Sequence, residues 1–352
     1  MHMADALISP IVGGTMWVAT AGITTYSIKK LQTDFQEEKI PLMGVMGAFV
    51  FASQMINFTI PGTGSSGHLG GGMLLAAMLG PYAGFIVMAS ILAIQALFFA
   101  DGGLIALGCN IFNLGFYTCF IAYPLVYKNI LKKGCSKKRI ITASMLAAII
   151  GLQLGAFSVV LQTFFSGKTE LPFSSFVTLM QPIHLAIGIV EGVVTAAVIS
   201  FVWKARPNTV DSFSKEAGSK VPVKKIILPL AIATIIVGAV LSWFASSNPD
   251  GLEWAMFKSS GKEEIETNYD AHKKAATIQE NTAILPDYGF KTSLDEVVNS
   301  GESKTSWPAV DPGTSVSGLV GGAMTLTIGI ATGIIINIFK KRRKAQRKES
   351  LN

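Results

Sequence analysis

The sequence predicts an all-α polytopic membrane protein. Half of the 352 residues are hydrophobic and only 14% are charged, whereas a soluble domain carries about a quarter charged residues. Residues 40–100 contain no Asp, Glu, Lys or Arg, and further uncharged runs cover 8–28, 102–127, 140–167, 226–249 and 312–339. A helix that crosses a bilayer needs about 20 apolar residues, and these runs supply that length several times. The composition excludes disordered, collagenous, disulfide-rich and ordinary cytosolic proteins.

Seven crossings are expected in the first 205 residues. They cover roughly 8–28, 41–58, 69–80, 82–100, 104–127, 140–166 and 174–203. The third is short and rich in glycine, and Pro81 separates it from the fourth. A dozen residues cannot cross a bilayer at about 1.5 Å of rise each. We therefore expect a half-helix inside the bundle, where irregular backbone is tolerated.

Two further helices are expected, at 226–246 and 314–339. They divide the chain into a transmembrane domain (1–205), a polar linker (206–225), a second unit (226–340) and a basic tail (341–352). The last helix carries the glycine pairs Gly318/Gly322 and Gly329/Gly333. Such spacing lets two helices approach closely in lipid. Their partner is either another helix of this chain or another subunit.

The positions of the charges predict the topology. The loops 29–40, 128–139 and 204–225 and the tail 340–352 hold 22 of the 29 Lys and Arg residues, whereas segment 247–313 holds 12 acidic residues and 6 Lys. Because cytoplasmic loops collect Lys and Arg, we expect the basic loops inside and segment 247–313 outside. Topology explains the net charge of +7, so no nucleic-acid partner is expected.

The N-terminus is expected outside the membrane and uncleaved. The first Lys is Lys29, after the first apolar run, so the positive region of a signal peptide is missing. The linker and the C-terminus are then cytoplasmic. With seven crossings before residue 205, every basic loop falls on the inner side.

Two histidines on the outer face form a candidate metal site. The free amine of Met1, the amide nitrogen of His2 and its imidazole can close two fused chelate rings on one ion. His68 lies in a glycine-rich loop after the second helix and could supply a fourth nitrogen. Square-planar nitrogen coordination suits Ni(II) or Cu(II). The alternative is that both histidines are simply solvated.

Glu191 is the one carboxylate inside an apolar run, and His184 lies two turns earlier on the same helix face. Ionisable groups at membrane depth face the protein interior or a polar cavity. The pair either guides ions inward or, as we favour, forms a structural hydrogen-bond network.

Three other polar residues are candidates for supporting roles. Asp101 closes an outer hairpin, and Asn110 and Asn113 follow in the fifth helix. Buried asparagines in lipid usually bridge helices, and nothing in their spacing ties them to the metal.

The remaining cysteines and histidine suggest no further site. Cys109, Cys119 and Cys135 form no CxxC pair, so we interpret them as small buried hydrophobic residues. His272, in the polar outer segment, is expected at the surface.

Two motifs are missing from the sequence. It contains no Walker A motif, so this chain cannot hydrolyse ATP to power transport, and no HExxH motif of a metalloprotease. We expect no enzyme activity from it.

Four segments resemble the nickel/cobalt substrate-capture (S) components of energy-coupling-factor ABC importers, the NikM/CbiM family. They are 1–5 (MHMAD), 61–72 (PGTGSSGHLGGG), 101–113 (DGGLIALGCNIFN) and 184–192 (HLAIGIVEG). Cys109 stands where small residues such as Ala are common in the family. The second unit, with 249–253 (PDGLE), resembles the small two-helix accessory component (NikN/PDGLE type) that is fused onto some members.

The resemblance implies a seven-helix S-component bundle plus two C-terminal transmembrane helices. It implies a metal site made by the Met1 amine, His2 and His68, with Ni(II) or Co(II) as the transported substrate. The implied partners are a transmembrane coupling (T) component, ABC ATPase subunits and the lipid bilayer of a prokaryotic cytoplasmic membrane.

A second hypothesis is a self-sufficient secondary transporter in which Glu191 and His184 relay protons. A membrane enzyme that uses the metal is a weaker one, because no general base lies near the histidines in sequence.

Overall fold

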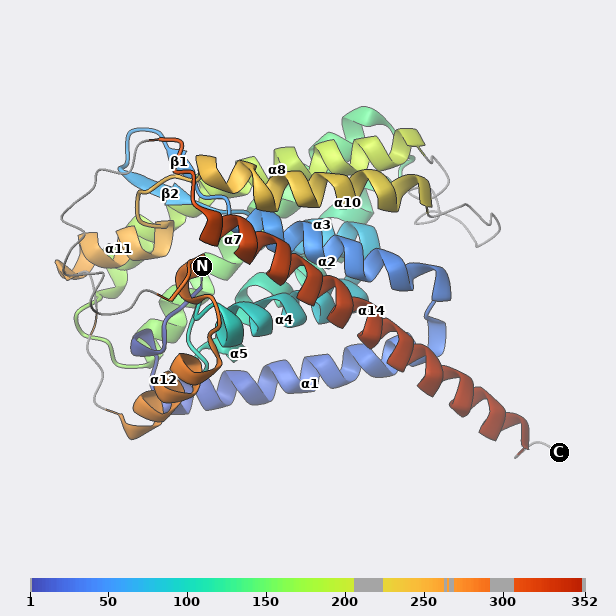
Figure 1. The fold of residues 1–352 in the computed structure, drawn as a ribbon, viewed down its shortest axis with the longest axis horizontal. Helices are drawn as coiled ribbons and strands as arrows, with labels where there is room; N and C mark the ends of the chain where they lie inside the picture. The colour runs from blue at the N-terminus through green and yellow to red at the C-terminus, as the bar shows by residue number, and fades with distance from the viewer. Residues whose placement is uncertain (1, 206–223, 263–264, 266–268, 292–306, 350–352) are drawn as a thin grey trace.

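The molecule is a bundle of helices with its two termini at opposite ends (Figure 1). The computed structural model describes residues 2–205, 224–262, 265, 269–291 and 307–349. The predicted linker 206–225 therefore lies almost wholly outside the described residues.

Helices form in every segment that the sequence predicts as a crossing. The first part contains η1 (Asp5–Leu7), α1 (Pro10–Asp34), η2 (Glu37–Lys39), α2 (Ile40–Gln54), α3 (Gly72–Leu79), α4 (Pro81–Phe98), α5 (Leu107–Ile111), η3 (Phe112–Tyr127), α6 (Lys128–Leu131), α7 (Lys137–Phe165) and α8 (Phe173–Ala205). The second contains α10 (Lys224–Ala239), η4 (Leu241–Phe244), α11 (Gly251–Ser260), α12 (Asp270–Thr282), η5 (Pro286–Tyr288) and α14 (Pro312–Glu349). A short hairpin between α2 and α3 pairs β1 (Phe58–Ile60) antiparallel with β2 (Ser65–Gly67).

Local sequence sets several helix ends. Ser9 precedes Pro10, and its side chain accepts a hydrogen bond from Val12 N at the start of α1, because the first N–H groups of a helix lack partners within it. Ser136 caps α7 in the same way. The elements α5, η3 and α6 form one continuous helix. Its η3 segment, which contains Pro124, is a π-helix, a type that is rare in proteins.

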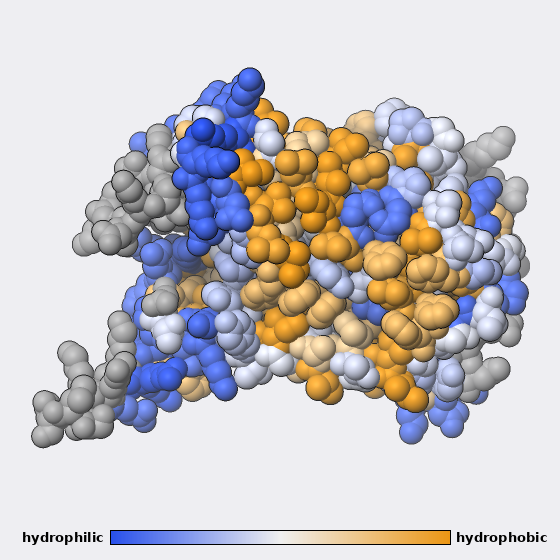
Figure 2. All heavy atoms as spheres, turned by 180° about the vertical axis from the view of Figure 1, so that it is seen from behind, coloured by the Kyte–Doolittle hydropathy of each residue, from blue (hydrophilic) through white to orange (hydrophobic). Residues whose placement is uncertain are grey.

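Among the residues that the structure describes, five helices are long and apolar enough to cross a membrane. They are Pro81–Phe98, Leu107–Leu131, Lys137–Phe165, Phe173–Ala205 and Pro312–Arg343. Helix α1 matches their length but is less apolar, and α2, α3 and α10 are shorter. Figure 2 shows a broad band of hydrophobic side chains between hydrophilic ends. The prediction of an all-α polytopic membrane protein is confirmed.

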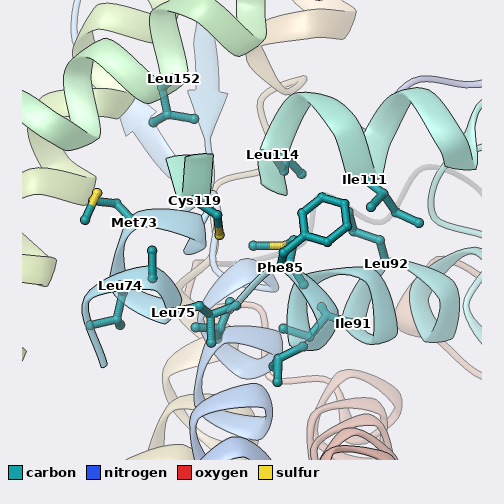
Figure 3. Packing of buried hydrophobic residues seen from close by; sticks show 14 of the residues in the cluster. Met73, Leu74, Leu75, Phe85, Ile91, Leu92, Ile111, Leu114, Cys119 and Leu152 are labelled. Atoms are coloured by element: carbon teal, nitrogen blue, oxygen red, sulfur yellow. The ribbon is translucent and has the colours of Figure 1, made fainter. Parts of the chain in front are cut away.

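The short helix α3 lies inside the bundle, as predicted, with all eight of its residues buried. Met73 and Leu74 of α3 pack in the same apolar core as Leu114 and Cys119 of η3 (Figure 3). Glycine is required at its start, because Gly71 has a left-handed backbone (φ 76°) and a side chain there would collide with Val50.

The three cysteines differ in burial: Cys109 and Cys119 are buried, and Cys135 is half-buried.

The glycine pairs of α14 pack against helices of the same chain. A Cβ placed on Gly238 of α10 would lie 3.3 Å from the backbone of Gly318, and one placed on Gly329 would lie 3.0 Å from Gly44 Cα of α2. The sequence left open whether these glycines pack against this chain or against another subunit. At these positions they pack against helices of this chain. The C-terminal helices are joined to the first part through α2.

The basic tail continues α14 as a helix. Lys341 Nζ lies 3.0 Å from a carboxylate oxygen of Glu37, and Lys340 donates a hydrogen bond to the carbonyl of Phe35. The tail and the basic loop 29–40 therefore lie at the same end of the bundle, as the charge pattern requires. The N-terminus, the hairpin, α11 and α12 lie at the other end (Figure 1).

A methyl group at the crossing of α2 and α14 is expected to destabilise the protein. In the Gly44→Ala variant the new Cβ would lie 2.7 Å from Leu326 O, and overpacking costs about 1–3 kcal/mol. Thermal unfolding in detergent should show a lower midpoint. The control is Gly22→Ala in α1, where nothing lies within 4 Å of the added carbon. Equal midpoints for the two variants would contradict the close crossing.

Candidate metal centre

The first described residues of the chain are held inside the end of the bundle opposite the basic tail. Met3 is completely buried. Its N–H donates to Asn110 Oδ1 at 2.8 Å, and its carbonyl accepts from Asn110 Nδ2 at 3.2 Å and from Gly103 N at 2.9 Å. A chain end otherwise frays. These three hydrogen bonds fix the backbone next to His2, while Met1 lies outside the described residues.

The loop between α4 and α5 is shaped to receive this segment. Asp5 Oδ1 accepts a hydrogen bond from Ala106 N at 2.8 Å, and Gly103 lies so close to Asp5 that no side chain would fit there. Gly102 has φ 81° and lies against Asn110. The sequence Asp101-Gly102-Gly103 therefore serves close backbone packing as well as the turn.

The structure brings His2 and His68 together. Their rings are stacked, with centroids 4.9 Å apart and planes inclined by 17°. His2 Nδ1 lies 3.0 Å from Asp101 Oδ1, and Tyr288 of the C-terminal unit donates a hydrogen bond to Asp101 Oδ2 at 2.5 Å. Burial alone would raise the pKa of Asp101, but His2, Tyr288 and His68 together outweigh it and hold that pKa well below its usual value.

His68 is positioned by the hairpin and by the C-terminal unit. Ser66 N, in β2, donates to the carbonyl of Pro249 at 2.8 Å. The His68 Nδ1 atom lies 3.1 Å from Leu69 O, and Nε2 lies 3.9 Å from Asp250 Oδ2. Burial, with a contribution from His2, lowers the pKa of His68 to about 3. The ring is therefore neutral near pH 7, the form that binds metals.

Side chains alone do not complete a metal site here. Within the described ranges, no three His, Cys, Asp or Glu side chains are grouped so that they could hold an ion. The two imidazoles would need a further donor from the backbone or from Met1.

Glu191 and His184 bond different groups. Glu191 of α8 accepts hydrogen bonds from Gly70 N (2.9 Å) and Met73 N (3.4 Å) at the start of α3, where the helix dipole favours a negative charge. His184 Nδ1 lies 2.8 Å from Met180 O in its own helix. Glu191 thus ties α8 to the segment that follows His68.

The two asparagines of the fifth helix both contact Met3, Asn110 through the backbone and Asn113 Nδ2 through the Met3 sulfur at 3.7 Å. Asn113 exchanges two hydrogen bonds with Gln162 of α7, at 2.8 and 2.9 Å, so it bridges two helices. Asn110 holds the Met3 backbone, as described above.

The sequence left open whether segment 247–313 gathers ions through its 12 carboxylates or contacts the outer loops, and it named no residue of the C-terminal unit as part of this site. Asp250 and Tyr288 both reach it, and only the PDGLE motif around Asp250 could have signalled this. The prediction that His272 lies at the surface is wrong: its side chain is 3% exposed. It is buried because it lies beside Asp5 and the carbonyl of Ile8, against the N-terminal segment.

Comparison with protein families gives two matches. The family described as the cobalt uptake substrate-specific transmembrane region matches residues 2–209. The family described as the PDGLE domain matches residues 224–338.

Individual proteins are similar over the same ranges. The chain is 31% identical to a putative fused nickel transport protein NikMN of Archaeoglobus fulgidus, over 94% of this chain and 97% of that protein. It is 35% identical to a putative metal transport protein of Haloquadratum walsbyi, over 60% of this chain and 93% of that protein. A crystal structure of a transition metal transporter aligns with a TM-score of 0.52 and 29% identity, covering 61% of this chain and 98% of that one.

Removal of the Asn110 amide should release the N-terminal segment. The Asn110→Ala variant loses two of the three hydrogen bonds of the Met3 backbone, and a lost buried hydrogen bond costs about 1–3 kcal/mol. Hydrogen–deuterium exchange of a peptide covering residues 2–8 should become about 5- to 100-fold faster. Asn129→Ala is the control, since Asn129 is exposed and donates to Leu125 O in its own helix. Unchanged exchange in Asn110→Ala would contradict the anchoring role.

Proposed function

This chain belongs to the family of cobalt uptake substrate-specific transmembrane regions, and on that premise we propose that it captures a nickel or cobalt ion for import. The observation that carries the proposal is the stacked pair of buried imidazoles, His2 and His68, beside an anchored N-terminus. Relatives named for nickel transport and for cobalt transport both match the chain.

Four nitrogens would bind the ion: the Met1 amine, the His2 amide and imidazole, and the His68 imidazole. If His2 Nδ1 binds the ion and so closes a chelate ring, the metal bond would replace the hydrogen bond between His2 Nδ1 and Asp101. The low pKa of His68 keeps its ring neutral near pH 7, the form in which imidazole binds metals. A planar set of nitrogens favours Ni(II), which forms square-planar complexes readily, so nickel is the preferred substrate.

The ion would enter from outside and be released inward with the help of partners. Charge distribution supports an external N-terminus and a cytoplasmic C-terminus. Since the sequence holds no Walker A motif, energy would come from ABC ATPase subunits joined through a transmembrane coupling component. In this proposal residues 1–205 capture the ion and 226–340 form the accessory unit.

Binding should depend on the free N-terminus. A few residues added before Met1 keep every side chain but remove the amine and the position of His2. Ni(II) affinity, measured by calorimetry on purified full-length protein, should fall by more than about 100-fold, because loss of outer-shell partners alone costs 10–100-fold. The control carries the same residues after Asn352. Equal affinities for the two extended proteins would exclude the amine as a ligand.

Uptake should require the ATPase. Cells that produce this chain with coupling and ATPase subunits should accumulate radioactive nickel, and cells without the ATPase should not. The alternative, a secondary transporter with Glu191 and His184 as proton relay, predicts uptake without any ATPase. That uptake would be abolished in Glu191→Gln while metal binding stayed intact. Such a result would overturn the importer proposal in favour of the alternative.

A further inference from the structure

The last helix of the chain continues past the bundle as a strongly basic segment. Helix α14 is uncharged up to Phe339, and its last ten residues, the tail helix (340–349, KKRRKAQRKE), hold seven Lys or Arg and one Glu. At about 1.5 Å of rise per residue, this segment adds about 15 Å to the helix. Figure 1 shows α14 crossing the other helices obliquely and leaving the bundle at one corner.

The side chains that precede the tail helix set its depth in the bilayer. Four large apolar side chains in the last two turns before it are exposed: Ile334, Ile335, Ile338 and Phe339. On a helix that spans a membrane, such side chains contact the lipid chains. Because the cations follow Phe339 directly, the start of the tail helix lies at the level of the lipid headgroups.

The first two cations of the tail helix bind the loop between α1 and α2. Lys340 donates a hydrogen bond to the carbonyl of Phe35, and Lys341 Nζ lies 3.0 Å from Glu37 Oε1. The tail helix belongs to the second unit and the loop to the first. These contacts therefore hold the tail helix beside the bundle, in the corner where the two units meet.

The next two cations, Arg342 and Arg343, have no such partner. Both side chains are exposed, and neither forms an ion pair within the described part of the chain. Like charges on neighbouring turns of a helix repel each other, so the tail helix is stabilised by anions from outside the chain. A guanidinium group binds phosphate through two parallel N–H bonds, and lipid headgroups carry phosphate at this depth.

We propose that the tail helix binds anionic phospholipids, with the guanidinium groups of Arg342 and Arg343 on the lipid phosphates. A cluster of about four to eight Lys or Arg directly after a membrane-spanning helix is typical of segments that bind anionic lipids. The bound lipid adds to the contacts of Lys340 and Lys341 and anchors α14 to the membrane surface. The proposal concerns the membrane and not the transported ion, so it stands apart from the proposed function.

The test measures lipid binding to the purified full-length protein in a neutral detergent. Native mass spectrometry counts the bound lipids and gives their affinity during titration with phosphatidylglycerol, which is anionic, or with phosphatidylcholine, which is neutral. Phosphatidylglycerol should bind more tightly. Raising the ammonium acetate concentration from about 0.1 M to about 1 M shortens the Debye length from about 10 Å to about 3 Å and should remove most of this preference.

The double variant Arg342→Gln/Arg343→Gln removes two charges and keeps a good helix former at both positions. Each charge near an anionic surface changes the affinity about fivefold, so phosphatidylglycerol should bind about 30-fold more weakly, with phosphatidylcholine unaffected. Arg342→Lys/Arg343→Lys keeps the charges and should retain most of the affinity.

The control for the loss of charge is Lys273→Gln/Lys274→Gln. These two lysines are exposed on α12, at the opposite end of the molecule. The control variant loses the same net charge as the double arginine variant, and it should bind phosphatidylglycerol as wild type does.

Four results would overturn the proposal. They are equal binding of the two lipids by wild type, unchanged phosphatidylglycerol binding in Arg342→Gln/Arg343→Gln, an equal loss in the α12 control, and a loss in the Lys variant as large as in the Gln variant. If phosphatidylglycerol binding is unchanged in the Gln variant but co-purification of ATPase subunits is lost, the tail helix binds an acidic protein surface instead of lipid.

Discussion

The candidate metal centre depends on the hydrogen bonds that hold the N-terminal segment in place. Asn110 and Gly103 bind both backbone groups of Met3, which fixes a segment that would otherwise fray as a buried part of the bundle. With Met3 fixed, the neighbouring imidazole can meet His68 without a loss of chain entropy at the moment of binding. The glycines of loop 101–103 also help to fix this segment, because they let its backbone pack closely against the loop.

The second imidazole is fixed by elements from elsewhere in the chain. Glu191 holds the segment after His68 against α8, and the hairpin before it is tied to Pro249 of the C-terminal unit. The buried half-helix α3 gives Glu191 backbone N–H groups to bind. The backbone beside each histidine is thus fixed by hydrogen bonds to other parts of the chain. Such support pre-organises a binding site.

The sequence was sufficient for the helices, for α3 and for the pairing of His2 with His68. Long uncharged runs leave few choices of fold, and counting α3 as a crossing places both histidines on one face. The contribution of segment 247–313 could not be predicted in this way. Its helices α11 and α12 are polar and are placed by distant contacts, such as Ser246 N to Asn57 O and Ile284 N to Phe98 O. Burial of His272 and the approach of Tyr288 to Asp101 follow from those contacts. Likewise, glycine spacing in α14 indicated a close crossing without naming α2 as its partner.

X-ray absorption spectroscopy of the Ni(II)-loaded, full-length protein tests the central claim most directly. The account predicts a four-coordinate, planar shell made of nitrogen alone, with the outer-shell scattering of two imidazole rings. A six-coordinate shell dominated by oxygen, or any sulfur ligand, would contradict it, because the proposed ligands are the Met1 amine, the His2 amide and the two imidazoles, all of which bind through nitrogen.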